Sequence, residues 1–422
     1  MATEDTKRRL GGIGRAFGDR NFCIHSIGAF ASWISFFVQI IAVSWLTWEL
    51  THSTKWLAVV ALLDIVPNVI LGPFGGALAD RYDRYWIMKI ANSLLLIQAV
   101  LMAGLAWLGL LTIWPLAILV LLHGILLSFS VPAMHGMLPR FVDKSLLPSA
   151  IAVNSSYTQF AVFAGPALAG WIISVHGLPM AFAVNAFGYV MLIISMLFLR
   201  TPEGYVQPKK NSHSILGDIA EGVSYIRAQR GISSLLILLL VGNALTASVY
   251  RMVPAYSERI LGMGIEGVSI ILASAGIGAT IAALWLAHGG EKAASARCVL
   301  WAFLIFILAV AVLYVFGNLY VAIAAAIVLG LAAEIWSTGT FTLIQLNVSE
   351  DQRGRVMGNM FMLRQFAGGV GTYLIGTFAV TQGLVAPTLI AVLCCFVVWL
   401  VFYVKRGQFE QQFRVISDSP TP

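Results

Sequence analysis

Charge and cysteine are both scarce in this sequence. Only 11% of its 422 residues are charged, against roughly 25% in an ordinary soluble domain, whereas 59% are hydrophobic. Because so few charges cannot cover a water-exposed surface, the composition excludes a soluble globular protein. The four cysteines show no metal-ligand spacing such as C-x-x-C, so we expect them to be apolar packing residues.

Motifs for nucleotide binding are also missing. No G-x-x-x-x-G-K-[ST] string occurs, so drive by ATP through this chain is unsupported and an ion gradient is the economical alternative. The Gly-x-Gly strings at 12–14 and 276–278 follow no strand, and close helix packing explains them better than a dinucleotide site. We therefore expect no enzymatic activity, no resident cofactor and no metal ion.

Long apolar runs are what the sequence has in abundance. A helix crosses the hydrocarbon core with about 20 apolar residues, and twelve runs of that kind occur, six on each side of a polar break. The sequence thus predicts an all-α membrane protein with twelve transmembrane helices in two six-helix bundles. The expected spans are 22–48, 56–79, 86–110, 115–138, 149–175, 178–199, 233–256, 266–287, 297–316, 319–346, 356–380 and 383–404.

The positions of the basic residues predict the orientation. Cytoplasmic loops carry the excess of Lys and Arg, and with the N-terminus inside, nearly all 26 such residues fall on the inner side. The exceptions are Lys55, Arg251, Arg259 and Arg364. The net charge of +7 is therefore explained by the orientation of the chain in the membrane and does not indicate a nucleic-acid partner. We expect a monomer in the inner membrane with both termini in the cytoplasm, and a first span that acts as its own insertion signal.

The polar break between the halves contains one amphipathic pattern. Apolar residues recur there at steps of three and four, at Ile215, Ile219, Val223 and Ile226. This spacing predicts a helix at the cytoplasmic membrane face, serving as a linker or in regulation. The predicted parts are a first bundle over 1–199, a linker over 200–232, and a second bundle with a tail over 233–422.

An internal repeat relates the two halves. Residues 157–170 (YTQFAVFAGPALAG) align with residues 363–376 (LRQFAGGVGTYLIG) at an offset of 206, with six identities in fourteen positions. Both segments would be the fifth helix of a six-helix half, which indicates a duplication. Parallel six-helix halves are the layout of transporters that rock around a site at the middle of the membrane.

The end of the second expected span carries the string GGALADRYDRY at 75–85. This string resembles the loop signature of the major facilitator superfamily, whose fold has twelve helices. In it we expect Gly76 to allow close helix approach and Asp80 to cap a helix or pair across the seam between the halves. Arg81 and Arg84 would hold carboxylates or helix C-termini, so that the motif biases a cytoplasmic gate. A simple positive-inside anchor is the alternative.

Further strings narrow the resemblance. Asp83 completes D-R-x-D-R, a form typical of the enterobactin-exporter-like branch of secretion and efflux transporters. The segment from Gly165 and Pro166 to Gly170 resembles the G-P-x-x-x-G signature of antiporters, where proline removes a backbone donor and small residues permit bending. Two positions depart from the pattern. Val162 stands where the branch often has arginine, so a mechanism that needs this arginine cannot be transferred, and Tyr85 replaces a basic residue.

Ionisable residues within spans are functional candidates, because burying a charge in the membrane is costly. In the first half, Asp64 and His123 lie at similar depths from the outer face and could meet as a proton site, or as a hydrogen-bonded packing pair. In the second half, Glu334 and Arg364 could pair across adjacent helices, or Arg364 could bind an anionic substrate while Glu334 binds protons. Arg251, near an outer end, could simply extend outward.

A further group of aromatic and polar side chains could line a substrate cavity. Helix packing or interfacial anchoring is the alternative for each of them. These residues are Trp33, Asn154, Gln159, Asn243, Arg251, Trp336 and Gln365.

Together these features predict a proton-driven exporter of a small amphipathic or siderophore-like molecule, working by alternating access. One alternative is an importer of a nutrient or organic anion on the same fold, with Arg364 or Arg251 as the anion contact. The other is a membrane sensor or scaffold that transports nothing. The predicted partners are therefore a small-molecule substrate, protons and the lipid bilayer.

Overall fold

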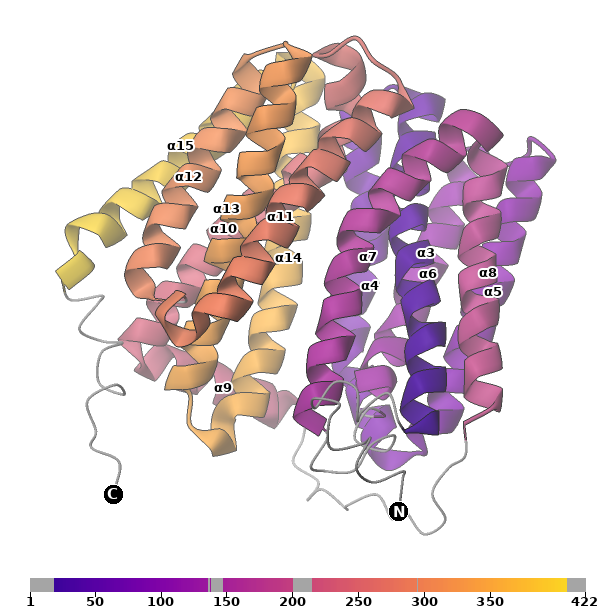
Figure 1. Ribbon diagram of the computed structural model, residues 1–422, viewed down its shortest axis with the longest axis horizontal. Coiled ribbons are helices and arrows are strands. Elements are labelled where there is room, and N and C mark those ends of the chain that lie inside the picture. Colours follow the sequence, from indigo (N-terminus) through magenta and orange to yellow (C-terminus); the bar gives the residue numbers. More distant parts are fainter. Residues whose placement is uncertain (1–18, 136, 138–146, 200–214, 294, 408–422) are drawn as a thin grey trace, which may run out of the picture. The chain divides into compact units, whose positions relative to one another are not determined.

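The computed structural model describes residues 19–135, 137, 147–199, 215–293 and 295–407, and within these ranges it has thirteen helices and no strand (Figure 1). The helices before the polar break are α3 (Arg20–Thr51), α4 (Thr54–Arg81), α5 (Arg84–Trp107), α6 (Ile113–His135), α7 (Leu147–His176) and α8 (Leu178–Leu197). Those after it are α9 (Ile215–Ala228), α10 (Arg230–Arg259), α11 (Ile265–Ala293), α12 (Ala296–Val315), α13 (Leu319–Asn347), α14 (Glu350–Gln382) and α15 (Val385–Val404).

Twelve of these helices are long, and they confirm the predicted fold class. Ten have both the length and the hydropathy to cross a membrane. The other two, α7 and α14, have 30 and 33 residues, or about 45 to 50 Å at about 1.5 Å per residue. Both exceed the roughly 30 Å of a hydrocarbon core. The short helix α9 lies where the amphipathic pattern predicts it, with Ile226 buried and Val223 half-buried.

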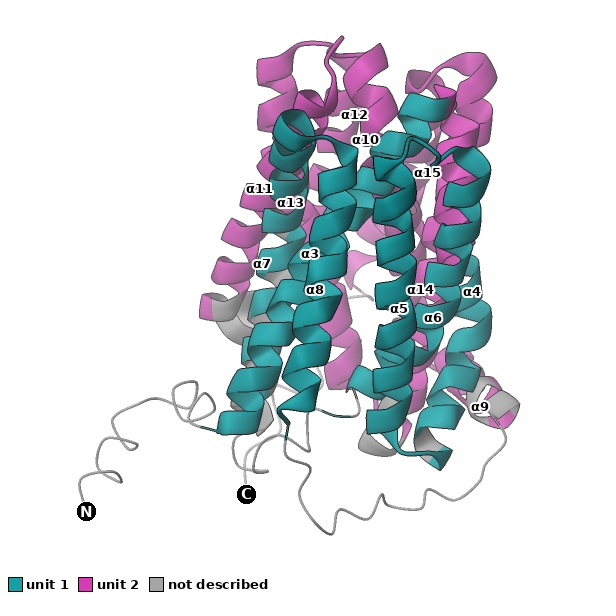
Figure 2. Cartoon of the chain, turned by 90° about the vertical axis from the view of Figure 1, so that its right-hand side faces the viewer, with its two compact units in different colours: residues 1–50, 66–212 teal, residues 51–65, 213–422 magenta. Residues whose placement is uncertain are grey.

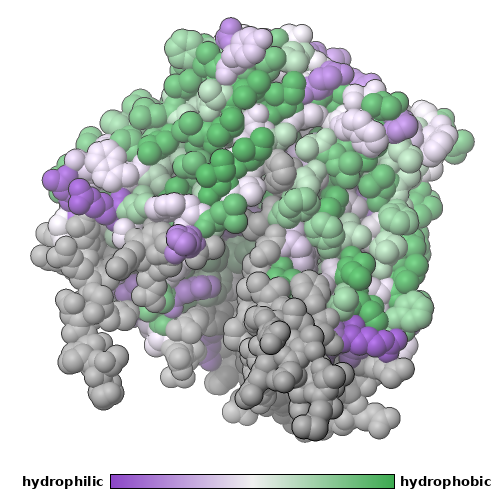
Figure 3. Space-filling view, viewed as in Figure 1, coloured by the Kyte–Doolittle hydropathy of each residue, from purple (hydrophilic) through white to green (hydrophobic). Residues whose placement is uncertain are grey.

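The surface is apolar in the way that lipid contact requires. Several large hydrophobic side chains are mostly exposed: Trp107 at 69%, Leu108 at 71% and Trp114 at 67%. Figure 3 shows one face on which hydrophobic residues prevail across the described helices. A water-soluble protein rarely leaves so much contiguous apolar surface uncovered, so these helices face lipid.

The chain divides into two compact units, each of which we describe by itself (Figure 2). Unit 1 comprises residues 1–50 and 66–212, and unit 2 comprises residues 51–65 and 213–422. The start of α4 thus groups with the later helices, whereas the rest of α4 groups with the earlier ones. The domain boundaries expected from the sequence, at 199 and 233, stay a prediction.

Each unit contains the same kind of close helix packing at a glycine. A Cβ at Gly165 in α7 would collide with Phe37 and approach the carbonyl of Ile34, both in α3. A Cβ at Gly371 in α14 would collide with the backbone of Ala244 in α10. These glycines are the aligned pair of the 206-residue offset. In each unit, therefore, the fifth long helix of the half packs tightly on the first through the same residue.

The start of α4 packs along α14 within unit 2. The Thr54 hydroxyl donates a hydrogen bond of 2.8 Å to the carbonyl of Gly376. Gly376 also leaves room for Ala58, and Gly369 leaves room for Leu62 one turn further along α4. Because small residues let two helix backbones approach, this stretch of α4 is held close to α14.

Candidate functional site

The loop motif joins the end of α4 to the start of α5 in unit 1. Asp83 caps α5, since its Oδ1 accepts a hydrogen bond of 3.0 Å from the Tyr85 amide. The Arg84 Nε donates at 3.0 Å to the carbonyl of Ala79 in the last turn of α4. A cation at this carbonyl end stabilises the helix dipole as well as satisfying an acceptor. Arg84 therefore holds a helix C-terminus, as the motif predicted.

One residue of the motif acts differently from the prediction. The expected close approach at Gly76 is wrong, because a Cβ there would meet no described atom within 4 Å. Gly75 makes the approach instead, facing the backbone of Ser128 in α6. Successive helix residues point about 100° apart, so Gly76 faces away. The Asp80 side chain lies outside the described residues, and Arg81 is exposed. The gating role stays a prediction.

Tyr85, which departs from the basic residue usual in the motif, has a packing role. Its hydroxyl donates a hydrogen bond of 3.1 Å to the carbonyl of Met196 in α8. This bond joins α5 to α8 at the end where the motif lies. A neutral phenol thus contributes a helix-to-helix contact in place of a charge.

His123 lies in the polar interior of unit 1. It is 3% exposed, its Nε2 lies 3.5 Å from the hydroxyl of Tyr189, and its ring stacks on Phe36 at 5.9 Å between centroids. The predicted partner, Asp64, belongs to unit 2, so the pairing of these two residues stays a prediction.

Sequence reasoning missed the amides around this interior. Gln39, Gln98 and Asn185 are 3% exposed or less, and in each the amide oxygen lacks a hydrogen-bond partner among the described residues. An unpaired buried acceptor costs about 1 to 3 kcal/mol, so these oxygens can accept a hydrogen bond from a donor that lies outside the described residues. Because an amide carries no net charge, these residues do not stand out in the sequence as buried charges do.

Three predicted cavity residues lie in α3 and α7. Trp33 packs against Phe36 and Phe37, with ring centroids 5.6 and 6.3 Å apart. The Oδ1 of Asn154 accepts a short hydrogen bond from the Tyr157 hydroxyl one turn along α7. The side chain of Gln159 lies outside the described residues. Trp33 and Asn154 thus have packing partners, and their cavity role stays a prediction.

Asp64 of α4 forms an ion pair with Arg251 of α10 inside unit 2. The carboxylate Oδ2 lies 3.6 Å from the guanidinium Nη2, and the side chains are 14% and 18% exposed. The expectation that Arg251 simply extends outward is therefore wrong. An unpaired charge at this depth would cost several kcal/mol, and the aspartate removes much of that cost.

Glu334 of α13 and Arg364 of α14 interact electrostatically within unit 2. The Glu334 Oε1 accepts a hydrogen bond of 2.7 Å from the Thr338 hydroxyl. The guanidinium carbon of Arg364 lies 5.9 and 6.0 Å from the rings of Phe341 and Phe361. Its Nε is buried without a hydrogen-bond partner among the described residues. The Arg364 Nε–H can therefore donate a hydrogen bond to a ligand.

Tyr250 lies in α10 directly before Arg251. It is half-buried and interacts electrostatically with Glu334. A neutral phenol is ordinary in a membrane helix, so the only signal for Tyr250 in the sequence is its position beside Arg251. We call these five residues the charged cluster of unit 2: Asp64, Tyr250, Arg251, Glu334 and Arg364.

The remaining cavity candidates lie beside this cluster. Trp336 is 1% exposed and packs against Phe303 and Phe306 at 5.2 and 5.7 Å, so it forms part of the core of unit 2, and its cavity role stays a prediction. The Asn243 side chain donates at 2.8 Å to the carbonyl of Arg364, which ties α10 to α14. Gln365 is half-buried.

Helix α9 is fastened to the start of α14. Glu221 accepts hydrogen bonds of 2.8 and 2.6 Å from the side chains of Gln352 and Arg355. The Tyr225 hydroxyl oxygen accepts a hydrogen bond of 3.3 Å from the Ser349 amide. Hydrogen bonding from Ser349 lowers the pKa of the Tyr225 phenol below its ordinary value, because it favours the ionised oxygen. The polar linker is thus attached to the helix that carries Arg364.

Metal ligands do not gather in the part of the chain that the structure describes, where no three His, Cys, Asp or Glu side chains lie close enough to hold an ion. The site is instead a set of ionisable and aromatic side chains. Such a set can bind and release protons and can hold an anionic group beside an apolar one.

Comparison with known proteins gives one family and several relatives. The family described as transmembrane secretion effector matches residues 16–418. Macrolide efflux protein A of Streptococcus pyogenes is 27% identical over 206 residues, so the chain spans only half of that relative (49% of this chain, 50% of that protein). The staphyloferrin A transporter of Staphylococcus aureus is 23% identical over 367 residues, covering 86% of this chain and 90% of that protein.

Solved structures match over nearly the whole length. A bacterial homologue of the human lysosomal transporter Spinster gives a TM-score of 0.73 at 14% identity, covering 94% of this chain and 98% of that one. A bacterial homologue of the iron transporter ferroportin gives 0.67 at 15% identity, covering 91% and 98%. At such low identity these matches concern the fold alone, and the fold they share is the twelve-helix one.

Proposed function

Because the chain belongs to the transmembrane secretion effector family of major facilitator transporters, we propose that it exports a small amphipathic or siderophore-like molecule in exchange for protons. It is a multi-pass membrane transporter and not an enzyme. The coupling to protons, the direction of transport and the substrate are what we propose.

The charged cluster of unit 2 is the observation that carries the proposal. Glu334 and Arg364 interact electrostatically, so a carboxylate and a guanidinium act on the same region of the unit. An ionised Glu334 could hold a hydrogen-bond donor or a cationic group of the substrate, whereas a protonated Glu334 could not. Proton and substrate would thus compete for one carboxylate, which is the requirement for exchange.

The surroundings of Arg364 fit an amphipathic substrate. Phe341 and Phe361 place two aromatic rings about 6 Å from the guanidinium, at 5.9 and 6.0 Å. A ligand with a carboxylate or phenolate beside an apolar surface could therefore bind the cation and stack on a ring. Two relatives, a macrolide efflux protein and a staphyloferrin A transporter, support a small-molecule substrate, and the first of them supports export.

Transport measured in proteoliposomes with an imposed pH gradient tests the coupling. Glu334→Gln should abolish gradient-driven flux of the substrate while substrate exchange without a gradient continues, since the amide keeps the shape of the side chain but cannot take up a proton. Glu266→Gln provides the matched control, because Glu266 lies exposed in the first turn of α11 in the same unit. If Glu334→Gln keeps the flux of the unaltered chain, Glu334 is not the coupling carboxylate.

Direction and orientation need separate measurements. Accumulation inside inverted vesicles would support export, and uptake into right-side-out vesicles would support the importer alternative, with Arg364 or Arg251 as the anion contact. A sensor or scaffold would move no candidate substrate in either direction. We place the protein in the inner membrane as a monomer with cytoplasmic termini, a topology that labelling of cysteines introduced at Lys405 and Lys55 would test from both sides.

A further inference from the structure

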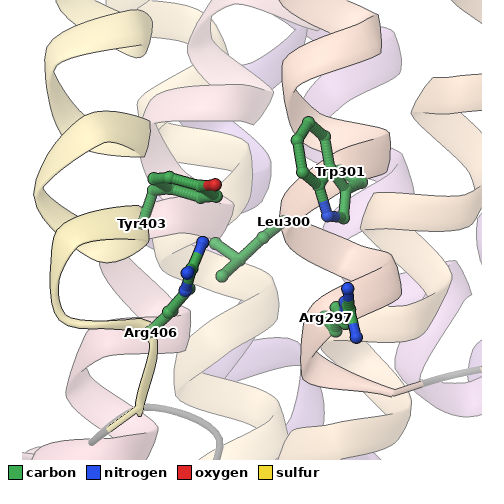
Figure 4. A pocket seen from close by; sticks show the side chains of 5 residues that line it. All are labelled: Arg297, Leu300, Trp301, Tyr403 and Arg406. Atoms are coloured by element: carbon green, nitrogen blue, oxygen red, sulfur yellow. The ribbon is translucent and has the colours of Figure 1, made fainter.

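A cavity between α12 and α15 lies far along the chain from the charged cluster and has its own chemistry. Its volume is about 240 Å³, and Arg297, Leu300, Trp301, Tyr403 and Arg406 line it (Figure 4). Arg297 and Trp301 belong to the first turns of α12, and Tyr403 and Arg406 lie at the end of α15. The site therefore combines two cations with two aromatic rings where two membrane helices end.

The aromatic wall of this cavity is held in place by packing. Tyr403 stacks on Trp399 at 4.9 Å and meets Trp301 edge-on at 5.8 Å. The Trp399 Nε1 donates at 2.9 Å to the carbonyl of Leu300, which fastens α15 to α12 directly beneath. Leu300, at 3% exposure, forms an apolar floor. The wall and the floor are thus ordered before any ligand arrives.

The guanidinium groups of Arg297 and Arg406 can still donate hydrogen bonds to an anionic ligand. The guanidinium of Arg406 lies 4.6 Å from the Tyr403 ring, and neither Arg297 nor Arg406 forms an ion pair with a described acidic residue. Both side chains are exposed. Two guanidinium groups beside one cavity supply the forked donors that suit the oxygens of a phosphate.

The expected depth of the cavity in the membrane indicates which class of ligand binds there. Lys and Arg placement puts the start of α12 and the end of α15 on the cytoplasmic side, where anionic lipids concentrate. Trp301 is 44% exposed, and an amphipathic ring of this kind prefers the headgroup level. The apolar flanks of α12 and α15 continue into the hydrocarbon region, where they can contact acyl chains.

From these observations we propose that the cavity binds the phosphate headgroup of an anionic glycerophospholipid, with Arg297 and Arg406 as the phosphate ligands. The lipid would bridge the ends of α12 and α15 and stabilise unit 2. This site is independent of the proposed proton coupling, because none of its residues belongs to the charged cluster.

Thermal unfolding of the purified full chain in detergent, with added lipid, tests the site. Phosphatidylglycerol should raise the unfolding midpoint more than phosphatidylcholine does, because a ligand that binds the folded state stabilises it. The double variant Arg297→Gln/Arg406→Gln should weaken the apparent affinity for phosphatidylglycerol by about tenfold or more, since charge-assisted hydrogen bonds are lost. Lys405→Gln is the matched control, because it removes an exposed charge next to Arg406 that does not line the cavity.

Two further measurements distinguish a lipid site from a site for a free anion and show that the double variant folds. Inorganic phosphate or glycerol phosphate should not reproduce the shift; if either does, the site takes a free anion and the lipid assignment is overturned. The double variant should unfold at the unaltered midpoint in phosphatidylcholine, which shows that it folds. A phosphatidylglycerol shift that is unchanged in the double variant, or lost equally in Lys405→Gln, would refute the site.

Discussion

The ion pair between Asp64 and Arg251 allows a prediction that separates stability from transport. At 3.6 Å and an effective dielectric constant of about 20, the two charges attract by roughly 4 to 5 kcal/mol. Desolvation offsets most of this, so the pair as a whole contributes little to the free energy of unfolding. Removing one partner is different, since it leaves the other charge buried and costs about 3 to 5 kcal/mol.

The perturbation is therefore a double-mutant cycle of Asp64→Asn and Arg251→Gln. Each single variant should lose about 3 kcal/mol of unfolding free energy, and the double variant should recover at least about 2 kcal/mol of the summed loss. Unfolding in detergent, followed at several denaturant concentrations, measures this. The exposed pair of His52 and Glu258, 61% and 42% accessible at its side chains, gives the control, because Glu258→Gln should cost less than about 1 kcal/mol.

Transport gives the second half of the test. If Asp64 takes part in proton coupling, the double variant should regain stability without regaining flux driven by a pH gradient. A double variant no more stable than the single ones would show that the pair is not what makes these charges tolerable. A stable double variant with full gradient-driven flux would refute a coupling role for Asp64.

Three other substitutions have expected outcomes. Gly371→Ala should destabilise unit 2 by about 1 to 3 kcal/mol, because the new Cβ meets the α10 backbone, whereas Gly358→Ala in the same helix has open space and should leave the unfolding midpoint equal or raised. Arg355→Gln should cost less than about 1 kcal/mol, because its bond to Glu221 is partly exposed, yet it should raise hydrogen exchange in α9. Asp80→Asn should slow transport while substrate binding, measured by calorimetry, stays unchanged; loss of binding would count against a gating role.

The fold was predictable because membrane helices show themselves as apolar runs. Ten of the helices pass as membrane spans by length and hydropathy alone, and the motif at 75–85 led to the family that the comparisons confirm. Even α9 was predictable, since a period near 3.6 residues survives in a short segment. These signals are local along the chain, and so they need no knowledge of tertiary packing.

The partners of the buried charges were harder to predict, because depth along a helix says nothing about rotation around it. Asp64 and His123 were matched by depth, yet the structure pairs Asp64 with Arg251 in a different helix. The same limit explains Gly76, where a difference of one residue, or about 100°, moves the close approach to Gly75. Tyr250 could not be chosen by charge, since only its three-dimensional neighbours give it a role.

Helix α4 joins the ion pair of Asp64 and Arg251 to the proposed gate. Its start, with Asp64, belongs to unit 2, whereas its later part, with Asp80, belongs to unit 1. The two aspartates are sixteen positions apart, or about 24 Å of helix. Pro67 lies just after the change of unit, where its missing amide leaves one helical hydrogen bond unmade and bending costs less. Pro73, one to two turns further along, removes a second amide from the same helix. A change in the Asp64 ion pair would therefore act on a helix that is continuous to the loop motif but lacks two helical hydrogen bonds on the way.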